Sequence, residues 1–244
     1  MLDTNRLCVL QATDLTTCMN CPRKRLSLFS DLNLEELEAL NRNRYEVDYQ
    51  AGETIYKEGT KPPGLICLNS GKVKISRQNA NGVEQIVALK KPVDFIGFRT
   101  LMGGHRFQTS AVALVDASVC IIEKNDFFKI IANNSVLAFK LIRFFASELN
   151  KAELRMVNLT QKHLRARLAD ALLMVNEVYG SCPVKRSLNL SLKRSDLAAL
   201  SNMTTANAIR VLSSFSKEKI IEVNQRDICL KDLKSLREIS DFGR

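Results

Sequence analysis

The sequence lacks the residue sets on which most enzymes depend. Its two histidines, His105 and His163, stand alone in the chain and suggest no catalytic base. It has no Ser/His/Asp set, no histidine motif for a metal ion, and no glycine-rich loop that would cradle a phosphate. We therefore predict that the protein is not an enzyme.

Long apolar runs are also missing. None approaches the roughly 20 residues that a helix needs to cross a bilayer. The first residues, MLDTNRLCVL, lack the charged start and long apolar core of a secretory signal. We expect a cytoplasmic protein with no membrane partner, whose seven cysteines stay reduced unless they bind a metal or sense redox state. Because seven is odd, a disulfide framework is not expected.

Acidic residues are the minority, 26 against 36 basic ones, which gives a net charge of +10. From Gln161 to the end, fifteen basic and nine acidic residues leave +6, whereas the longer remainder, with 21 and 17, carries +4. No basic helix has a strongly apolar face, so nucleic acid is a better candidate partner than a membrane. A basic surface that serves only solubility is the alternative that charge alone leaves open.

The middle of the chain has a β pattern. Short runs such as ETIYKEG, GLICLNSGKVKISRQ and TSAVALVDASVCIIE lie between Tyr45 and about Glu123, with glycines between them. The stretch NANG is a hairpin signal. The pattern predicts a small antiparallel barrel or jelly roll. A short helix over Leu32–Asn41, with Asn33 as its N-cap, is expected before it.

A long helix is expected next, from about Asn134 to Thr160. Apolar residues recur in it at alternating spacings of four and three, which is typical of the seam of a two-stranded coiled coil and so of a homodimer. Charged residues hold the other faces and leave the apolar strip narrow; a core-facing stripe of an ordinary helix is the alternative. The predicted seam comprises Ala138, Ile142, Phe145, Leu149, Ala152, Met156 and Leu159.

The C-terminal region has the pattern of a helix-turn-helix. A helix from about Arg194 breaks at Ser201–Asn202, where asparagine tolerates the left-handed conformation that the turn needs. A second helix begins at about Thr205 and is expected to read the major groove of DNA. The segment KIIEVNQRDICLKD then predicts two short strands, a wing. A generic helical hairpin is the alternative. The buried face of the second helix is expected to hold Ala208, Val211, Leu212 and Phe215.

Together these patterns predict an α+β chain of four parts. They are a cysteine-containing segment (residues 1–27), an antiparallel barrel or jelly-roll sensor domain (28–132), a long dimerisation helix (133–161) and a winged helix-turn-helix (162–244). This order resembles the Crp/Fnr family of bacterial transcription regulators. QAGETIYKEGTKPPGLICLNSGKVKI and VDFIGFRTLMGG are similar to its cyclic-nucleotide-type barrel, and RSDLAALSNMTTANAIRVL is similar to its DNA-reading unit. The resemblance implies a dimer that binds double-stranded DNA, and RNA polymerase as a partner if the protein activates transcription.

The resemblance also implies which residues face DNA. Arg210 is expected to donate two hydrogen bonds to guanine, beside apolar side chains that suit thymine methyl groups. Hydroxyl groups near it are expected to position phosphates. The full set is Arg194, Ser195, Thr204, Thr205, Ala206, Asn207, Ile209, Arg210 and Ser213.

The barrel departs from the members of the family that bind cyclic AMP. Those members carry a Gly-Glu pair and an Arg-Ser/Thr-Ala triplet, whose Glu and Arg hold the ribose hydroxyl and the phosphate. Here Gly97 precedes Phe98, and the triplet region reads QTSA, without an arginine. We expect an effector other than cyclic AMP, with redox state, oxygen or nitric oxide as candidates. The resemblance places the effector pocket at Phe98, Arg99, Thr109 and Ser110.

The stretch TTCMNCPRKR resembles the CxxC of the cluster-binding members of the family. That resemblance implies Cys18, Cys21 and Cys120 as ligands of an iron–sulfur cluster. The remaining ligand position falls near Ser27, a poor iron ligand, and Cys8 is the other N-terminal thiol that can substitute for it. A redox dithiol, a zinc site, and no cysteine chemistry at all stay open as alternatives. Structural roles are expected for the remaining cysteines, Cys67, Cys182 and Cys229.

A second class of function stays open beside the DNA-binding one. The chain would then be a ligand- or redox-gated sensor whose C-terminal unit binds a protein. Strong salt dependence of binding to duplex DNA separates the two, because DNA binding releases counterions from phosphates.

Overall fold

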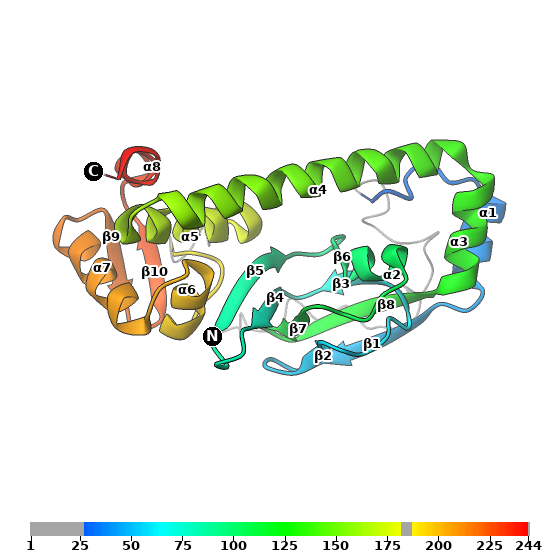
Figure 1. The fold of residues 1–244 in the computed structure, drawn as a ribbon, viewed down its shortest axis with the longest axis horizontal. Coiled ribbons are helices and arrows are strands. Elements are labelled where there is room, and N and C mark those ends of the chain that lie inside the picture. The colour runs from blue at the N-terminus through cyan, green and yellow to red at the C-terminus, as the bar shows by residue number, and fades with distance from the viewer. Residues whose placement is uncertain (1–26, 182–186, 244) are drawn as a thin grey trace, which may run out of the picture.

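Two four-stranded antiparallel sheets form the N-terminal half of the protein in the computed structural model, which describes residues 27–181 and 187–243 (Figure 1). The strand orders are β1-β8-β3-β6 and β2-β7-β4-β5. These sheets confirm the expected antiparallel domain and the α+β class. The strands are β1 (Tyr45–Tyr49), β2 (Thr54–Tyr56), β3 (Gly64–Ser70), β4 (Val73–Gln78), β5 (Glu84–Lys90), β6 (Phe95–Ile96), β7 (Ser110–Ala113) and β8 (Ala117–Glu123).

Side chains alternate between the two faces of the first sheet, as the period of a strand requires. On β3, Ile66 and Leu68 point between the two sheets and belong to the inner core with residues of β4, β7 and β8. Leu65, the neighbour of Ile66, belongs instead to a second cluster on the outer face of the sheet, which helices cover. The first sheet is therefore packed on both faces.

The helices on that outer face are α1 (Leu34–Asn41), α2 (Phe98–Gly103), α3 (Lys124–Asn133) and the start of α4 (Ser135–Gln161). The predicted N-cap of α1 is confirmed: Asn33 accepts from the Glu36 backbone N–H, and the Glu36 carboxylate accepts from the Asn33 N–H, both at 2.9 Å. A second asparagine, Asn134, caps α4 and donates to the other Glu36 oxygen at 2.7 Å. These side-chain bonds satisfy backbone donors that a helix start leaves unpaired.

Helix α4 is the longest element, with 27 residues, which corresponds to about 40 Å. It runs from α3 beside the sheets to the C-terminal unit (Figure 1). None of the helices in the described ranges is by itself long and apolar enough to span a membrane. Only α3 and α4 taken together meet that test, and they are bent by 108° at their junction.

The C-terminal unit packs its helices and a two-stranded ribbon around its own hydrophobic cluster. Two residues of β5, Ile86 and Leu89, are buried in the same cluster, so the barrel and the C-terminal unit share a core. The sequence pattern separated the two units and did not anticipate this contact. The elements are α5 (Leu164–Tyr179), α6 (Arg194–Leu200), α7 (Thr205–Lys217), β9 (Ile221–Asn224), β10 (Asp227–Leu230) and α8 (Leu233–Phe242).

Candidate DNA-binding surface

Helices α6 and α7 meet at the turn that the sequence predicted. Asn202 has φ +51°, the left-handed conformation expected of it, and the next N–H, of Met203, donates back to Ala198 O at 3.0 Å. Ala198 is buried, as the close approach of the two helices requires. The Thr204 hydroxyl caps α7 by accepting from the Asn207 N–H at 3.3 Å. The helix boundaries and the turn are confirmed.

Helix α7 is amphipathic in the predicted sense. Ala208, Leu212 and Phe215 are buried, and Val211 is half-buried. The opposite face is open to solvent. Its exposed residues include Thr205, Ala206, Ile209, Arg210, Ser213 and Lys217.

Arg210 stands in the middle of this exposed face. Within the described part of the chain, no residue forms a hydrogen bond or an ion pair with it. Ile209 next to it is 51% exposed, so an apolar side chain lies in solvent beside the guanidinium. A guanidinium with all its donors available, flanked by an exposed apolar side chain, has the chemistry to read a guanine and a neighbouring thymine methyl group.

A wing follows α7, as predicted. Strands β9 and β10 pair antiparallel from Asp227↔Asn224 to Leu230↔Ile221, and Gln225 in the turn has φ +54°. Arg226, at the tip of this turn, is exposed. The sequence analysis recognised the wing but did not select Arg226, although a basic residue at a wing tip is a plain signal for a phosphate contact.

Arg194, predicted to face DNA, is instead partly engaged inside the unit. Its Nη2 donates to Gln225 O at 2.7 Å, so it ties the start of α6 to the wing turn. The side chain is half-buried, and this burial lowers the pKa of its guanidinium. Ser195 beside it is exposed and Asn207 is half-buried. The predicted DNA-facing residues thus lie on α6, on α7 or at the cap of α7, with Arg194 also serving the fold.

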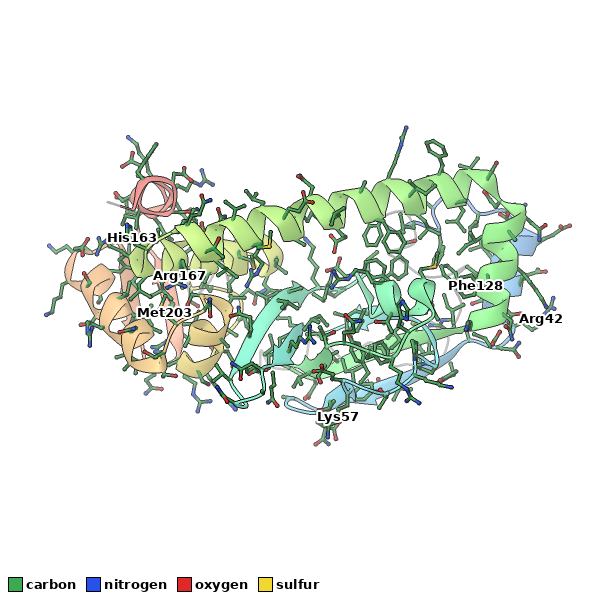
Figure 2. The ribbon with its side chains drawn as sticks, in the orientation of Figure 1. Arg42, Lys57, Phe128, His163, Arg167 and Met203 are labelled. Atoms are coloured by element: carbon green, nitrogen blue, oxygen red, sulfur yellow. The ribbon has the colours of Figure 1, made fainter. Side chains whose placement is uncertain are left out.

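Helix α7 is held in place from α5. Arg165 donates to Glu218 Oε1 at 2.7 Å and to the Ser214 hydroxyl at 3.0 Å, and its guanidinium lies over the Phe215 ring. The Arg165 guanidinium, with the Ser214 hydroxyl, lowers the pKa of Glu218 to about 2. Arg167, labelled in Figure 2, donates to Asn202 O at 2.9 Å and so supports the turn itself.

The barrel also holds α6. Lys74 Nζ lies 2.7 Å from Asp196 Oδ1 and 2.9 Å from Glu84 Oε2, and Gln85 Nε2 donates to Ala199 O at 2.7 Å. Arg155 on α4 donates through Nη2 to two carbonyls at 2.9 Å, Ile86 O on β5 and Leu200 O on α6. The sensor half and the DNA-reading half are therefore joined by buried polar contacts as well as by the shared core.

Most of the predicted seam of α4 is not covered by other parts of the chain. Ile142, Leu149 and Met156 are 61–62% exposed, and Ala152 is also exposed. Ala138, Phe145 and Leu159 are half-buried at the edge of the strip. The sequence analysis did not include four further exposed apolar residues of the same helix, namely Val136, Phe139, Leu154 and Val157.

Comparisons with known proteins agree with this arrangement. The model of the cyclic nucleotide-binding domain matches residues 46–134, and that of the Crp-like helix-turn-helix domain matches residues 166–239. The two matches lie in the order and at the places that the fold shows. The chain belongs to the Crp/Fnr family. It is a DNA-binding transcription regulator of the Crp/Fnr type.

Individual relatives match this Crp/Fnr-type chain over most of its length. The cyclic AMP receptor protein of Thermus thermophilus is 26% identical over 88% of this chain and 97% of its own. The fumarate and nitrate reduction regulatory protein of Escherichia coli is 24% identical over 93% and 91%. Among solved structures, FixK2 of Bradyrhizobium japonicum has a TM-score of 0.70 at 26% identity, over 80% of this chain and 96% of that one. A CRP/FNR family regulator of Thermus thermophilus, at 23% identity, shows the same fold with a TM-score of 0.69, over 81% and 98%.

In this Crp/Fnr-type barrel the predicted effector residues differ in their surroundings. Phe98 is buried against α4, with its ring centroid 4.9 Å from that of Phe144 and 5.2 Å from that of Phe145. Arg99 is exposed. Thr109 Oγ1 lies 3.4 Å from the Tyr56 hydroxyl, and the Ser110 hydroxyl accepts from the Glu58 N–H at 3.0 Å. Phe98 was selected because it follows Gly97, but an apolar ring at that position packs inward.

The space beside Gly97 is filled by aromatic rings. Tyr56 stacks on Phe107 with the centroids 3.8 Å apart, and a Cβ at Gly97 would lie 2.3 Å from the Phe107 ring. The nearest candidate for a phosphate anchor, Arg106, donates to Gly59 O at 3.0 Å. The Phe107 ring and the Arg106 contact thus define the surroundings of Gly97.

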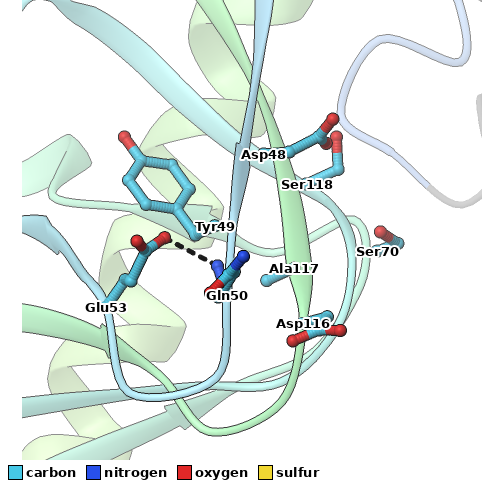
Figure 3. A pocket seen from close by; sticks show the side chains of 8 residues that line it. All are labelled: Asp48, Tyr49, Gln50, Glu53, Ser70, Asp116, Ala117 and Ser118. Carbon is cyan, nitrogen blue, oxygen red and sulfur yellow. Dashed lines mark hydrogen bonds between the residues drawn. The ribbon is translucent and has the colours of Figure 1, made fainter.

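An open depression lies elsewhere on the barrel, at the ends of β1 and β8 (Figure 3). Its acidic side chains are Asp48, Glu53 and Asp116, and two of them cap turns. Glu53 accepts from the Gln50 N–H at 2.7 Å, and Asp116 accepts from the Ala51 N–H at 2.9 Å. A depression lined by carboxylates would repel a phosphate, and it contains none of the four predicted effector residues.

Of the cysteines predicted to hold a cluster, Cys8, Cys18 and Cys21 lie outside the described residues. Cys120 is half-buried on β8, where Arg44 Nη2 lies 2.7 Å from its sulfur and Glu46 Oε1 lies 3.5 Å away. Burial raises the pKa of the Cys120 thiol to about 11, against the opposing effect of Arg44. In the described ranges, no three His, Cys, Asp or Glu residues are grouped closely enough to hold a metal ion.

Proposed function

We propose that the protein is a dimeric, cytoplasmic regulator whose α7 helices read two half-sites of duplex DNA. The observation that carries this proposal is the exposed face of α7, on which Arg210 offers its donors beside Ile209 while the opposite face is buried. Thr204, Thr205 and Ser213 flank this face as phosphate contacts, and Arg226 at the wing tip extends it.

The exposed strip of α4 supports the dimer. Ile142, Leu149 and Met156 are each more than 60% exposed, and their spacing of seven residues suits a parallel coiled coil. Pairing two chains along α4 would give two copies of α7, which is the arrangement that reads a two-fold symmetric site.

The effector in this proposal is not cyclic AMP. The nucleotide would lack two contacts that it needs, because no Glu follows Gly97 and QTSA has no arginine. Aromatic rings also fill the space beside Gly97. Redox state, oxygen or nitric oxide are the candidates, since the similar Escherichia coli protein is named for fumarate and nitrate reduction. If the protein activates transcription, RNA polymerase is a partner.

Selection of bound duplexes from a random library tests the proposal. We expect an inverted repeat whose half-sites are centred about 10 base pairs apart, or a multiple of that spacing. Affinity for the selected duplex should fall by orders of magnitude between about 50 and 200 mM salt, because several phosphate contacts release counterions. Failure to enrich any sequence, with binding that salt barely changes, would favour the alternative of a protein partner.

A further inference from the structure

The C-terminal end of α6 is capped by side chains of the barrel and of α4. A helix leaves its last carbonyl groups without partners inside the helix. In α6, Ala199 O accepts from Gln85 Nε2 of β5 at 2.7 Å, and Leu200 O accepts from Arg155 Nη2 of α4 at 2.9 Å. The turn to α7 begins at the next residue, Ser201. The barrel and the long helix therefore hold the C-terminal unit directly beside its turn.

Arg155 joins four elements at one point. Besides Leu200 O, its Nη2 donates to Ile86 O of β5 at 2.9 Å, and its Nη1 lies 2.8 Å from the Met174 sulfur of α5. The pairing register of β4 and β5 shifts beside Ile86, and a bulge of this kind bends the strand locally. One guanidinium on α4 thus contacts the barrel, α5 and α6.

The Arg155 guanidinium is held by neutral partners. In the described part of the chain no carboxylate forms an ion pair with it, and its Nε is buried without a hydrogen-bond partner. Burial lowers the pKa of this guanidinium. The cost of removing the charge from water is therefore not offset by an ion pair. What the side chain does provide is a rigid fork of donors, which fixes the directions of the carbonyls that it meets.

The chain connection alone does not fix the C-terminal unit on α4. Helix α4 ends at Gln161 and α5 begins at Leu164, and the two residues between them, Lys162 and His163, are extended. A few residues between two elements are a typical hinge. The shared core of β5 and the C-terminal unit is held by hydrophobic contact, which has no direction. A hydrogen bond weakens steeply when its angle changes, so polar contacts determine the orientation.

Arg155 also lies next to the predicted dimer seam. Met156, the following residue, is 62% exposed and belongs to the seam, whereas Arg155 is half-buried against the C-terminal unit. In the proposed dimer, neighbouring residues of α4 would thus face the second copy and the C-terminal unit. The separation of the two α7 helices then depends on the angle at which each C-terminal unit is held on α4.

We propose that Arg155 is a positioning residue that fixes the orientation of the C-terminal unit on α4 and so sets the spacing of half-sites that the dimer accepts. This inference rests on the proposed function. It adds to that function a determinant of DNA specificity that lies outside the DNA-reading surface.

Binding to duplexes of altered spacing tests this role. Fluorescence anisotropy compares the selected duplex, a version with one base pair inserted between the half-sites, and a version with one half-site scrambled. One inserted base pair moves the half-sites about 3.4 Å apart and rotates them by about 35°. The wild type should therefore bind the inserted duplex at least about tenfold more weakly than the selected one. Arg155→Leu and Arg155→Lys, which lack the fork of donors, should lower this ratio to less than about threefold.

The scrambled duplex separates positioning from damage to the C-terminal unit. It offers one half-site, so the wild type and the Arg155 variants should bind it equally, because α7 is unchanged. Lys151→Met is the control on α4: its side chain is 71% exposed, and the variant should keep the wild-type ratio. Gln85→Ala removes the barrel donor to Ala199 O and leaves α4 intact. It should lower the ratio as well, and it decides the question if the Arg155 variants fail to fold.

Arg155 variants that keep the wild-type ratio would overturn the proposal. An equal loss on all three duplexes would also do so, because it would indicate a purely structural role. Tighter binding of the selected duplex by the variants would overturn it too, since the contact would then hold a state unfit for DNA. A wild type that binds the selected and scrambled duplexes alike would instead refute the dimeric reading of two half-sites, and the inference with it.

Discussion

The ion pair between Lys74 on the barrel and Asp196 on α6 gives a sharp test of how the two halves are joined. The two charged atoms lie 2.7 Å apart, and the side chains are only 12% and 10% exposed. Lys74→Met would leave the Asp196 carboxylate buried without its partner. Removing one member of a buried pair typically costs about 3–5 kcal/mol. We expect about 3 kcal/mol here, because both groups keep some contact with solvent.

The loss of stability comes from the Asp196 charge that is left without a partner. Removing both charges should therefore restore most of the lost stability. In Lys74→Met/Asp196→Leu we expect a loss of about 1 kcal/mol, caused by Glu84, which also pairs with Lys74. The double variant should then be about 2 kcal/mol more stable than Lys74→Met alone. Lys151→Met is the matched control: it removes a lysine that is 71% exposed from its pair with Glu148, and it should cost less than about 1 kcal/mol.

Urea unfolding followed by far-ultraviolet circular dichroism measures these free energies. The shared core of β5 and the C-terminal unit couples the two halves, so the loss should appear in the main transition. If Lys74→Met costs no more than Lys151→Met, or if the double variant loses the sum of both single losses, the ion pair does not hold α6 to the barrel.

Three further predictions concern the seam, the support of α7, and the effector. Ile142→Asp or Leu149→Asp should convert the dimer into a monomer in sedimentation at micromolar concentration. Leu154→Asp is the control and should leave the dimer intact, because Leu154 is equally exposed, at 61%, but lies on another face of α4. A monomeric wild type would contradict the proposed dimer. The pKa of Glu218 in the folded protein is about 2, below its ordinary 4.5. The Arg165 contact should therefore stabilise the fold fully above pH 4.5, and this stabilisation should be lost as the pH falls through 2. A Glu218 carboxyl carbon that titrates at pH 4.5 in NMR spectra would refute this. Cyclic AMP should not raise the melting temperature, whereas a ligand at a hundredfold excess over its Kd would add about 2.7 kcal/mol of stability.

Local rules in the sequence were enough for the helix-turn-helix and for the start of α1. Asn202 marks a left-handed turn, Asn33 marks a cap, and the apolar period of α7 marks its buried face, and each of these signals depends only on residues close in the chain. Contacts between distant segments could not be obtained in this way. The burial of Phe98 under α4 and the use of Arg194 to hold Gln225 depend on tertiary packing.

The cysteines show the same limit more clearly. Cys120 was found through a family resemblance, while Cys67 had no signal of its own and was expected to be structural. Its position opposite Cys120 follows from the register of β3 and β8, and a strand register is set by the packing of whole faces rather than by the residues near one cysteine. The contact of β5 with the C-terminal unit was missed for a related reason, since Ile86 and Leu89 read equally well as core residues of the barrel.

The central claim is that α7 reads DNA through Arg210, and one comparison tests it directly. Fluorescence anisotropy should measure the affinity of the wild type, Arg210→Ala and the control Arg237→Ala, an exposed arginine on α8, for the selected duplex and for random DNA. Loss of a bidentate contact to guanine predicts that Arg210→Ala weakens binding to the selected duplex by about 1–3 kcal/mol. It should change binding to random DNA little, and Arg237→Ala should resemble the wild type on both. An equal loss on selected and random DNA would assign Arg210 to phosphate contacts and contradict the account.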